Sequence, residues 1–206
     1  MHLSHANALW LLVPVKPFAE SKSRLSPPLD SAARAALSRD LLHRVLLSAG
    51  DANLFAGVVV VSRDADVRAC ATAWGAQPLV EEVANLNAAL EQARRAALAQ
   101  GADAIMVLPA DLPLVTGAAL RTLAAALPAA PAMVIAPSST GGTNALLLHP
   151  ADALPFAFGI ESCARHCALA DARGLTIIIQ PAPELAFDVD LPADLQRLTA
   201  LYQARA

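Results

Sequence analysis

The sequence predicts a single α/β domain built on a doubly wound, mixed and mostly parallel sheet. Apolar runs of strand length alternate along the chain with longer segments of helical periodicity, which is typical of repeated strand–helix units. Several of these runs are apolar throughout, as expected for strands covered by helices on both faces. The 206 residues contain no internal repeat and no low-complexity linker, so we expect residues 1–206 to form one domain.

Short apolar runs, many of them β-branched and bounded by polar or turn-forming residues, are the expected strands. In chain order they are Leu9–Pro14, Gly57–Ser62, Gln77–Val80, Ala104–Leu108, Ala132–Ala136, Thr143–Leu148 and Leu175–Gln180. In a sheet of this kind ligands bind beyond the carboxyl ends of the strands. The residues that directly follow each run are therefore the first candidates for a functional site.

The longer segments between the strands are the expected helices, because their apolar residues recur at helical spacing. In chain order they are Ser31–Ser48, Ala65–Trp74, Leu86–Gln100, Thr116–Leu127, Ser162–Ala172 and Ala193–Gln203. Asp64 and Thr116 stand where helix N-caps are expected, while Gly101 and Gly174 stand where helices are expected to stop.

Composition excludes several classes of protein. The chain is 56% hydrophobic but only 16% charged, and the apolar excess consists mostly of alanine. No run approaches the about 20 apolar residues of a membrane-spanning helix, so we expect no contact with a membrane. The formal net charge of −3 argues against a nucleic-acid-binding protein that relies on a basic face.

Cysteine content and the first residues indicate a cytoplasmic protein. Three cysteines in a chain of this length form no disulfide framework, and their odd number fits a reducing compartment. Met1–Asn7 lacks a basic region, and the apolar stretch Ala8–Val15 is followed by no small-residue cleavage site. We therefore expect no signal peptide.

The loop after the first expected strand is basic. Lys16, Lys22 and Arg24 lie within Val13–Leu25, and cations at the carboxyl edge of a sheet suit a polyphosphate ligand. A solvated basic loop before the first helix is the alternative. The sequence contains no G-x-x-x-x-G-K-[ST] segment, so a Walker-type phosphate loop is excluded.

Two further segments place carboxylates after expected strands. Asp111 follows an apolar strand and is flanked by prolines; it could hold a divalent cation such as Mg²⁺ beside substrate phosphates, or brace a turn. Asp188 and Asp190 lie two positions apart on an extended segment, and we expect only one of them to face a metal together with Asp111. Asp194 lies in the first turn of the last expected helix, where it suits a structural role.

A glycine-containing turn and a helix start add polar groups without charge. Thr143 and Asn144 follow two glycines and open a buried strand, so their side chains could contact a substrate; a plain hairpin turn is the alternative. Gly159 and Ser162 precede the next helix. That position suits an anion-binding helix terminus, and an ordinary serine N-cap explains it equally well.

Taken together, five segments resemble the guanylyltransferase family of coenzyme F420 biosynthesis, whose members act on 2-phospho-L-lactate, phosphoenolpyruvate or 3-phospho-D-glycerate. In order along nearly the whole chain they are VPVKPFAESKSRL, LPADLPLV, GGTNALLL, FGIESCARH and FDVDLPADL. Pieces similar to LPADLP and DVDLP also occur in nucleotidyltransferases for sugars and for the molybdenum cofactor. The most specific part is therefore GGTNALLL followed by FG-x-x-S-x-x-x-H.

The resemblance implies a nucleotidyltransferase domain of the GT-A-like, Rossmann-like type. It implies transfer of GMP from GTP to the phosphate of a small phosphorylated carboxylic acid, with release of pyrophosphate. By position, Lys16, Lys22 and Arg24 would hold the GTP phosphates. Asp111 and Asp190 would hold Mg²⁺, and Lys16, Lys22 and Asp111 would be the catalytic residues.

Further residues carry over to the two substrates. The resemblance implies that Thr143, Gly159 and Ser162 bind the phosphate and carboxylate of the acid. Asn87 matches the asparagine of the family's G-L-N-A-A segment near the nucleoside, although Asn85 stands where a glycine is usual.

Three alternatives stay open. The chain could be a nucleotidyltransferase of the molybdenum-cofactor type, or a catalytically inactive GTP-binding regulatory module on the same fold. Acidic residues at both expected metal positions argue against the inactive module. A homodimer through an alanine-rich helix such as Ala89–Ala99 is also open, although internal packing of that helix is favoured.

Overall fold

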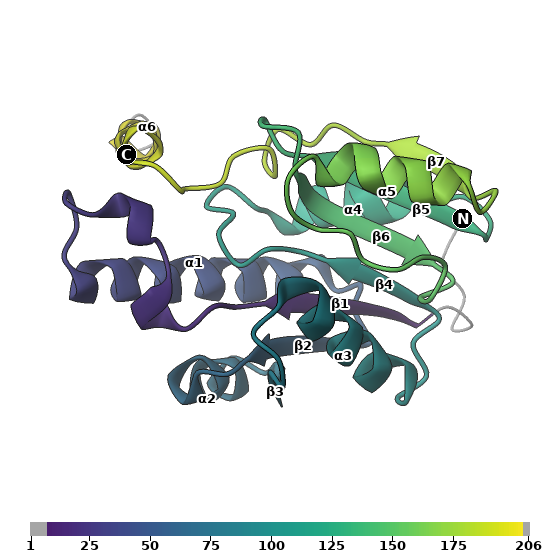
Figure 1. The fold of residues 1–206 in the computed structure, drawn as a ribbon, viewed down its shortest axis with the longest axis horizontal. Coiled ribbons are helices and arrows are strands. Elements are labelled where there is room, and N and C mark those ends of the chain that lie inside the picture. The colour runs from purple at the N-terminus through teal and green to yellow at the C-terminus, as the bar shows by residue number, and fades with distance from the viewer. Residues whose placement is uncertain (1–7, 204–206) are drawn as a thin grey trace.

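The computed structural model describes residues 8–203, and within them a seven-stranded sheet lies between two layers of helices (Figure 1). The strands are β1 (Leu9–Pro14), β2 (Gly57–Ser62), β3 (Gln77–Val80), β4 (Ala104–Val107), β5 (Ala132–Pro137), β6 (Thr143–His149) and β7 (Thr176–Ile179). The helices are α1 (Ser31–Ala52), α2 (Ala65–Ala73), α3 (Leu86–Leu98), α4 (Gly117–Ala125), α5 (Ser162–Asp171) and α6 (Pro192–Gln203). The predicted single domain is described over these residues; Met1–Asn7 lies outside them.

The strand order is β3-β2-β1-β4-β6-β5-β7. Every neighbouring pair is parallel except the two that contain β6, which is antiparallel to both β4 and β5. The sheet is therefore mixed and mostly parallel, as the sequence predicts. Because of this arrangement, the carboxyl ends of the parallel strands and the amino end of β6 meet at one edge, which gathers their loops around a common space.

Alternating side chains of each strand build two separate cores. In β1, Leu9, Leu11 and Val13 pack with α1, α2 and α4, whereas Trp10 and Leu12 pack with α3 and α5 on the other face. Figure 1 shows α3 and α5 on the near face of the sheet and α1 and α4 behind it. Since both faces are covered, the interior strands are apolar along their whole length.

A small third cluster ties the end of the chain to the loop after β1. Leu25 of the 3₁₀ turn η2 (Ser23–Leu25) packs with Phe187, Val189 and Leu198. Figure 1 shows α6, which carries Leu198, beyond the edge of the sheet. The segment between Phe187 and Val189 is thereby fixed beside the basic loop.

Helix boundaries differ from the expected ones mainly at α1. The helix continues past Ser48 to Ala52, because the buried Ala49 and Ala52 stabilise the added turn despite Gly50. Asn53 ends the helix in the left-handed conformation, which asparagine adopts more readily than most residues. The other predicted helices and strands end within two residues of the observed ones.

The capping residues behave as predicted. The Asp64 and Thr116 side chains accept hydrogen bonds from backbone N–H groups in the first turns of α2 and α4. Gly101 and Gly174 both have positive φ angles after helices, as expected for glycine stops. None of the helices between residues 8 and 203 combines the length and apolarity needed to cross a membrane.

Gly57 at the start of β2 leaves room for the indole of Trp10. A Cβ atom at residue 57 would clash with the Trp10 ring, and Trp10 is buried. We therefore expect Gly57→Ala to lower the free energy of unfolding by about 1–3 kcal/mol through overpacking. Gly50→Ala in α1, where nothing lies within 4 Å of the new Cβ, is the control and should stabilise slightly. Urea unfolding of both variants measures the difference, and equal stabilities would contradict the expected clash.

Candidate active site

A cavity of about 650 Å³ lies at the edge where the strand ends meet. Its walls come from the loops after β1, β4 and β3, the turn between β5 and β6, and the segments before α5 and α6. The predicted site residues that line it are Lys16, Lys22, Asp111, Thr143, Asn144, Gly159, Ser162 and Asp190. Segments that are far apart in the sequence thus contribute to one cavity, as expected if ligands bind beyond the carboxyl ends of the strands (the carboxyl-edge rule).

Lys22 lies at the centre of the charged end of this cavity. Its Nζ donates to a carboxylate oxygen of Asp111 at 2.6 Å and to one of Asp190 at 3.0 Å. The Lys22 side chain is only 7% exposed. Burial lowers the pKa of Lys22, but the charges and hydrogen bonds of Asp111 and Asp190 outweigh it, so the pKa lies above its ordinary value. Lys22 is therefore a fixed ammonium group.

The backbone of Lys22 is held in an unusual conformation. Its φ of 56° lies in the left-handed region, which costs a residue with a side chain on the order of 1 kcal/mol. The residue stands between the 3₁₀ turns η1 (Phe18–Glu20) and η2. Such strain is found where the surrounding structure requires a particular side-chain direction, and here that direction leads to the two carboxylates.

Three carboxylates converge beside Lys22. One oxygen from each of Asp111, Asp188 and Asp190 lies within 4.8 Å of the others. The prediction that only one of Asp188 and Asp190 faces Asp111 is wrong, because residues i and i+2 of an extended segment share a side. Burial, and next the charge of Asp111, raise the pKa of Asp188. This group could hold a divalent cation, which would relieve the crowding of negative charge.

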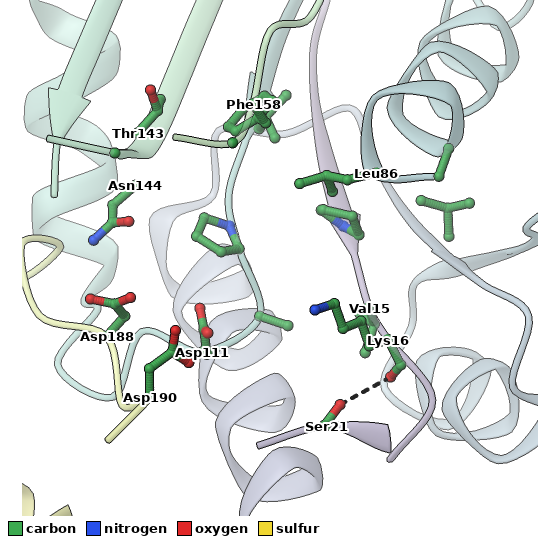
Figure 2. Close-up of a pocket in the computed structure, with 18 of the residues that line it drawn as sticks. Val15, Lys16, Ser21, Leu86, Asp111, Thr143, Asn144, Phe158, Asp188 and Asp190 are labelled. Carbon is green, nitrogen blue, oxygen red and sulfur yellow. Dashed lines mark hydrogen bonds between the residues drawn. The ribbon is translucent and has the colours of Figure 1, made fainter. Parts of the chain in front are cut away.

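Figure 2 shows Lys16 on the opposite wall, with its side chain extending toward these carboxylates. Lys16 is exposed to solvent and lines the cavity, while its backbone oxygen accepts a bond from Ser21 Oγ at 3.4 Å. Arg24 lies on η2, is exposed and is not part of the lining. The structure therefore brings Lys16 and Lys22 together and leaves Arg24 outside.

Asn144 and Asp194 hold the aspartate segment in place. Asn144 lines the cavity, and its Nδ2 donates to the Leu185 carbonyl oxygen at 2.7 Å. Asp194 accepts from the backbone N–H groups of Asp190 and Leu191 at 3.1 and 2.7 Å, which confirms its structural role. Asn144 was predicted to contact substrate, but this hydrogen bond instead positions the segment that carries Asp188 and Asp190.

The segment before α5 is held by Asn87. Its side chain accepts a bond from the Phe158 N–H at 2.8 Å and donates to the Phe158 carbonyl at 3.2 Å. Asn87 itself is not part of the cavity lining, whereas its neighbours Asn85 and Leu86 are. The structure therefore gives Asn87 a bracing task next to Gly159, and its contact with a nucleoside stays a prediction.

Thr143, Ser162 and His166 form a buried chain of hydrogen bonds. Ser162 Oγ donates to Thr143 Oγ1 at 3.0 Å, and Thr143 Oγ1 lies 3.2 Å from His166 Nδ1. The Ala157 N–H donates to His166 Nε2 at 3.0 Å. All three side chains are nearly inaccessible to solvent. The motif that ends in His166 thus joins the β5–β6 turn to the start of α5.

The protonation of His166 predicts a pH dependence of stability. Burial, with a smaller contribution from the charge of Arg165, lowers the pKa of His166 from 6.5 to about 4. The folded protein therefore resists protonation more than the unfolded chain does. This stabilisation is fully present above pH 6.5 and is lost as the pH falls toward 4, by on the order of 3 kcal/mol.

We expect the stability of wild-type protein to fall more steeply between pH 7 and 4.5 than that of His166→Asn, which has no titrating ring. Urea unfolding of both proteins at each pH measures the difference, and the comparison cancels the carboxylates that both share. Parallel pH dependences would contradict the shifted pKa of His166.

Some features of the lining were not found from the sequence. The joint placement of Asp188 and Asp190 beside Asp111 could have been found by the i, i+2 rule for extended segments. Arg63 and Glu81 line the cavity directly after β2 and β3, where the same carboxyl-edge argument applies. They also form an ion pair at 3.3 Å. His166 belongs to the most specific motif of the sequence, but the spacing of that motif alone did not predict a role for this side chain.

The model of the family described as guanylyl transferase CofC like matches residues 9–201. The chain belongs to this family. A phosphoenolpyruvate guanylyltransferase of Rubrobacter xylanophilus is 44% identical over 194 residues, which are 94% of each chain. A 3-phospho-D-glycerate guanylyltransferase of Colwellia psychrerythraea is 30% identical over 191 residues, 93% of this chain and 91% of that protein. The predicted family is confirmed.

The fold of this CofC-like guanylyltransferase is also that of other nucleotidyltransferases. A solved nucleotidyl transferase from Methanothermobacter thermautotroptrophicus has a TM-score of 0.67 and 19% identity. The alignment covers 97% of this chain and 100% of that chain. The likeness confirms the predicted fold class, while the acceptor of the guanylyl group is a separate question.

Proposed function

We propose that the chain transfers GMP from GTP to phosphoenolpyruvate, with release of pyrophosphate, as a step of coenzyme F420 biosynthesis. The observation that carries this proposal is one cavity with Lys16, Lys22 and three carboxylates at one end and Thr143 and Ser162 at the other. The 44% identity to a phosphoenolpyruvate guanylyltransferase over 94% of the chain supports the choice of acceptor.

The reaction needs charge neutralisation more than a strong base. An oxygen of the acceptor phosphate, already an anion, attacks the α-phosphorus of GTP. A new phosphoric anhydride bond forms, and the bond to the β-phosphate oxygen breaks as pyrophosphate leaves. The obstacle is the approach of one anion to another. The ammonium groups of Lys16 and Lys22 offset the charge on the α-phosphate and the leaving pyrophosphate, and they align the two reactants.

The carboxylate cluster fits a magnesium ion. Three convergent carboxylates are a hard oxygen donor set, the kind that Mg²⁺ takes together with substrate phosphates. Asp111 and Asp190, with Asp188 beside them, would hold the ion, which would polarise the α-phosphate of GTP. The ammonium of Lys22 bridges Asp111 and Asp190, so its positive charge lies beside the place where the ion and the phosphates would bind.

The uncharged end of the cavity suits the acid. Thr143 and Ser162 present hydroxyl groups there, and α5 begins at Ser162. A helix of this orientation favours an anion near its first residues. Gly159 has a φ of 130°, so only glycine holds this turn without strain and lets a ligand approach the backbone.

The test is pyrophosphate release from GTP and Mg²⁺, in parallel with phosphoenolpyruvate, 3-phospho-D-glycerate and 2-phospho-L-lactate, with product masses checked. We expect release with phosphoenolpyruvate, a product equal to the acid plus GMP less water, and loss of activity with EDTA that Mg²⁺ restores.

Other outcomes are equally informative. Release with 3-phospho-D-glycerate alone would replace the acceptor, in line with the relative of that name. Activity only with CTP or a pterin acceptor would move the chain to another nucleotidyltransferase class. If a folded sample binds GTP but releases no pyrophosphate with any of the acids, the catalytically inactive regulatory module becomes the favoured interpretation.

A further inference from the structure

The hydrogen bonds of His166 determine which of its ring nitrogens carries the proton. A backbone N–H can only donate, so the Ala157 N–H requires His166 Nε2 to accept. In a neutral ring the proton then resides on Nδ1. His166 Nδ1 therefore donates to Thr143 Oγ1, 3.2 Å away.

Thr143 Oγ1 consequently accepts two hydrogen bonds, one from His166 and one from Ser162 Oγ. A hydroxyl oxygen has two lone pairs and one proton, so both acceptor positions are filled and the proton of Thr143 must be donated elsewhere. Thr143 lines the cavity. Among the hydrogen bonds of the described residues, none uses this proton, which is free to bond a ligand.

We propose that His166 is a positioning residue for the phosphorylated acid: it fixes Thr143 as a donor that aims its hydroxyl proton into the cavity. The inference rests on the proposed function, because the acid is the ligand that the Thr143 hydroxyl meets. A carboxylate or phosphate oxygen is an acceptor only, and a fixed donor matches it. His166 is fully buried and does not itself line the cavity, whereas Thr143, which it contacts, does.

The surroundings of the ring maintain this state. Phe158 packs edge-on against it, with centroids 4.8 Å apart. The charged group that acts on it is Arg165 of the same helix, which together with burial lowers the pKa of His166. A protonated ring would place a second N–H opposite the N–H of Ala157, so burial and geometry both favour the neutral form with the proton on Nδ1.

A matched pair of variants separates positioning from packing. In His166→Asn, the amide nitrogen replaces Nδ1 and keeps the donor to Thr143. In His166→Gln, the amide oxygen replaces Nε2 and keeps the acceptor for Ala157 but loses the donor. We expect the KM for phosphoenolpyruvate to rise about tenfold in His166→Gln and much less in His166→Asn. A tenfold change is about what the weakening of one hydrogen bond to a charged group costs. The KM for GTP should be unchanged in both.

A double-mutant cycle with Thr143→Val tests whether His166 acts through Thr143. Removing the hydroxyl should weaken acid binding by itself, and adding His166→Gln should then raise the KM for phosphoenolpyruvate no further. Additive effects would contradict the route through Thr143. Nitrogen NMR of wild-type protein gives a check that needs no variant: we expect a neutral ring with the proton on Nδ1 at pH 7.

Each contrary outcome has its own meaning. If wild-type protein releases no pyrophosphate with any acid, the proposed function fails, and this inference fails with it. If wild-type protein is active but both variants raise the KM for acid and GTP alike, His166 is only a packing residue and this inference alone is overturned. A proton on Nε2 would overturn it as well.

Discussion

Asp111→Asn is expected to lower kcat for pyrophosphate release by on the order of 10³-fold while the protein stays folded. The amide keeps the size and shape of the carboxylate but removes one negative charge from the group of Asp111, Asp188 and Asp190. A neutral amide is a weaker ligand for Mg²⁺. Half-maximal activity should therefore require a higher Mg²⁺ concentration, which a titration of rate against Mg²⁺ measures.

The fold should tolerate this substitution for a structural reason. Lys22 retains Asp190 as a partner at 3.0 Å, so no ammonium is left buried alone. Removing the charge of Asp111 also removes one of the causes that raise the pKa of Asp188. Asp40→Asn, the same change at an exposed position of α1, is the matched control and should leave kcat unaltered. Near-normal turnover of Asp111→Asn would remove Asp111 from the proposed metal site.

The fold was predictable because its determinants are local. The alternation of Leu9, Leu11 and Val13 with Trp10 and Leu12 assigns each side chain to one of the two cores, and this period of two is visible in the sequence. Caps and stops depend on single residue types. The antiparallel direction of β6 could not be predicted in this way, because an apolar run of residues does not indicate which strand it pairs with or in which direction.

The site was predictable as a set of segments but less so as a set of contacts. The carboxyl-edge rule brought Lys16, Lys22, Asp111 and Asp190 to one cavity. The bond from Lys22 to Asp190 joins residues 168 positions apart, and it depends on the packing of α6 against Leu25. Such a contact follows from tertiary structure, which single segments do not encode.

The polar residues with bracing tasks illustrate the same limit. Asn87 and Asn144 are amides that donate and accept equally well, so their residue type fits a substrate contact or a backbone brace. The structure shows both bound to backbone groups, of Phe158 and Leu185. Only the surrounding loops decide between the two tasks, and those loops lie far away in the sequence.

Lys22→Met is expected to have the second large effect, and it separates two roles of one ammonium group. Methionine keeps an unbranched, flexible stem that fills similar space but leaves three crowded carboxylates without their cation. Since Asp190 is 48% exposed, the loss of stability without Mg²⁺ should be about 2 kcal/mol, less than for a fully buried pair. Added Mg²⁺ should then raise Tm more in the variant than in wild-type protein, because no lysine competes for the carboxylates.

Turnover of Lys22→Met should nevertheless stay low at saturating Mg²⁺, because the triphosphate has lost a cation that the metal does not replace. We expect kcat/KM for GTP to fall on the order of 10²-fold. Lys16→Met is the matched control for stability: its side chain is exposed, so it should affect GTP kinetics with little change in Tm. Recovery of full activity by Mg²⁺ in Lys22→Met would restrict this lysine to holding the carboxylates together. Unchanged stability and unchanged GTP kinetics would contradict both roles and return the loop after β1 to a solvated basic segment.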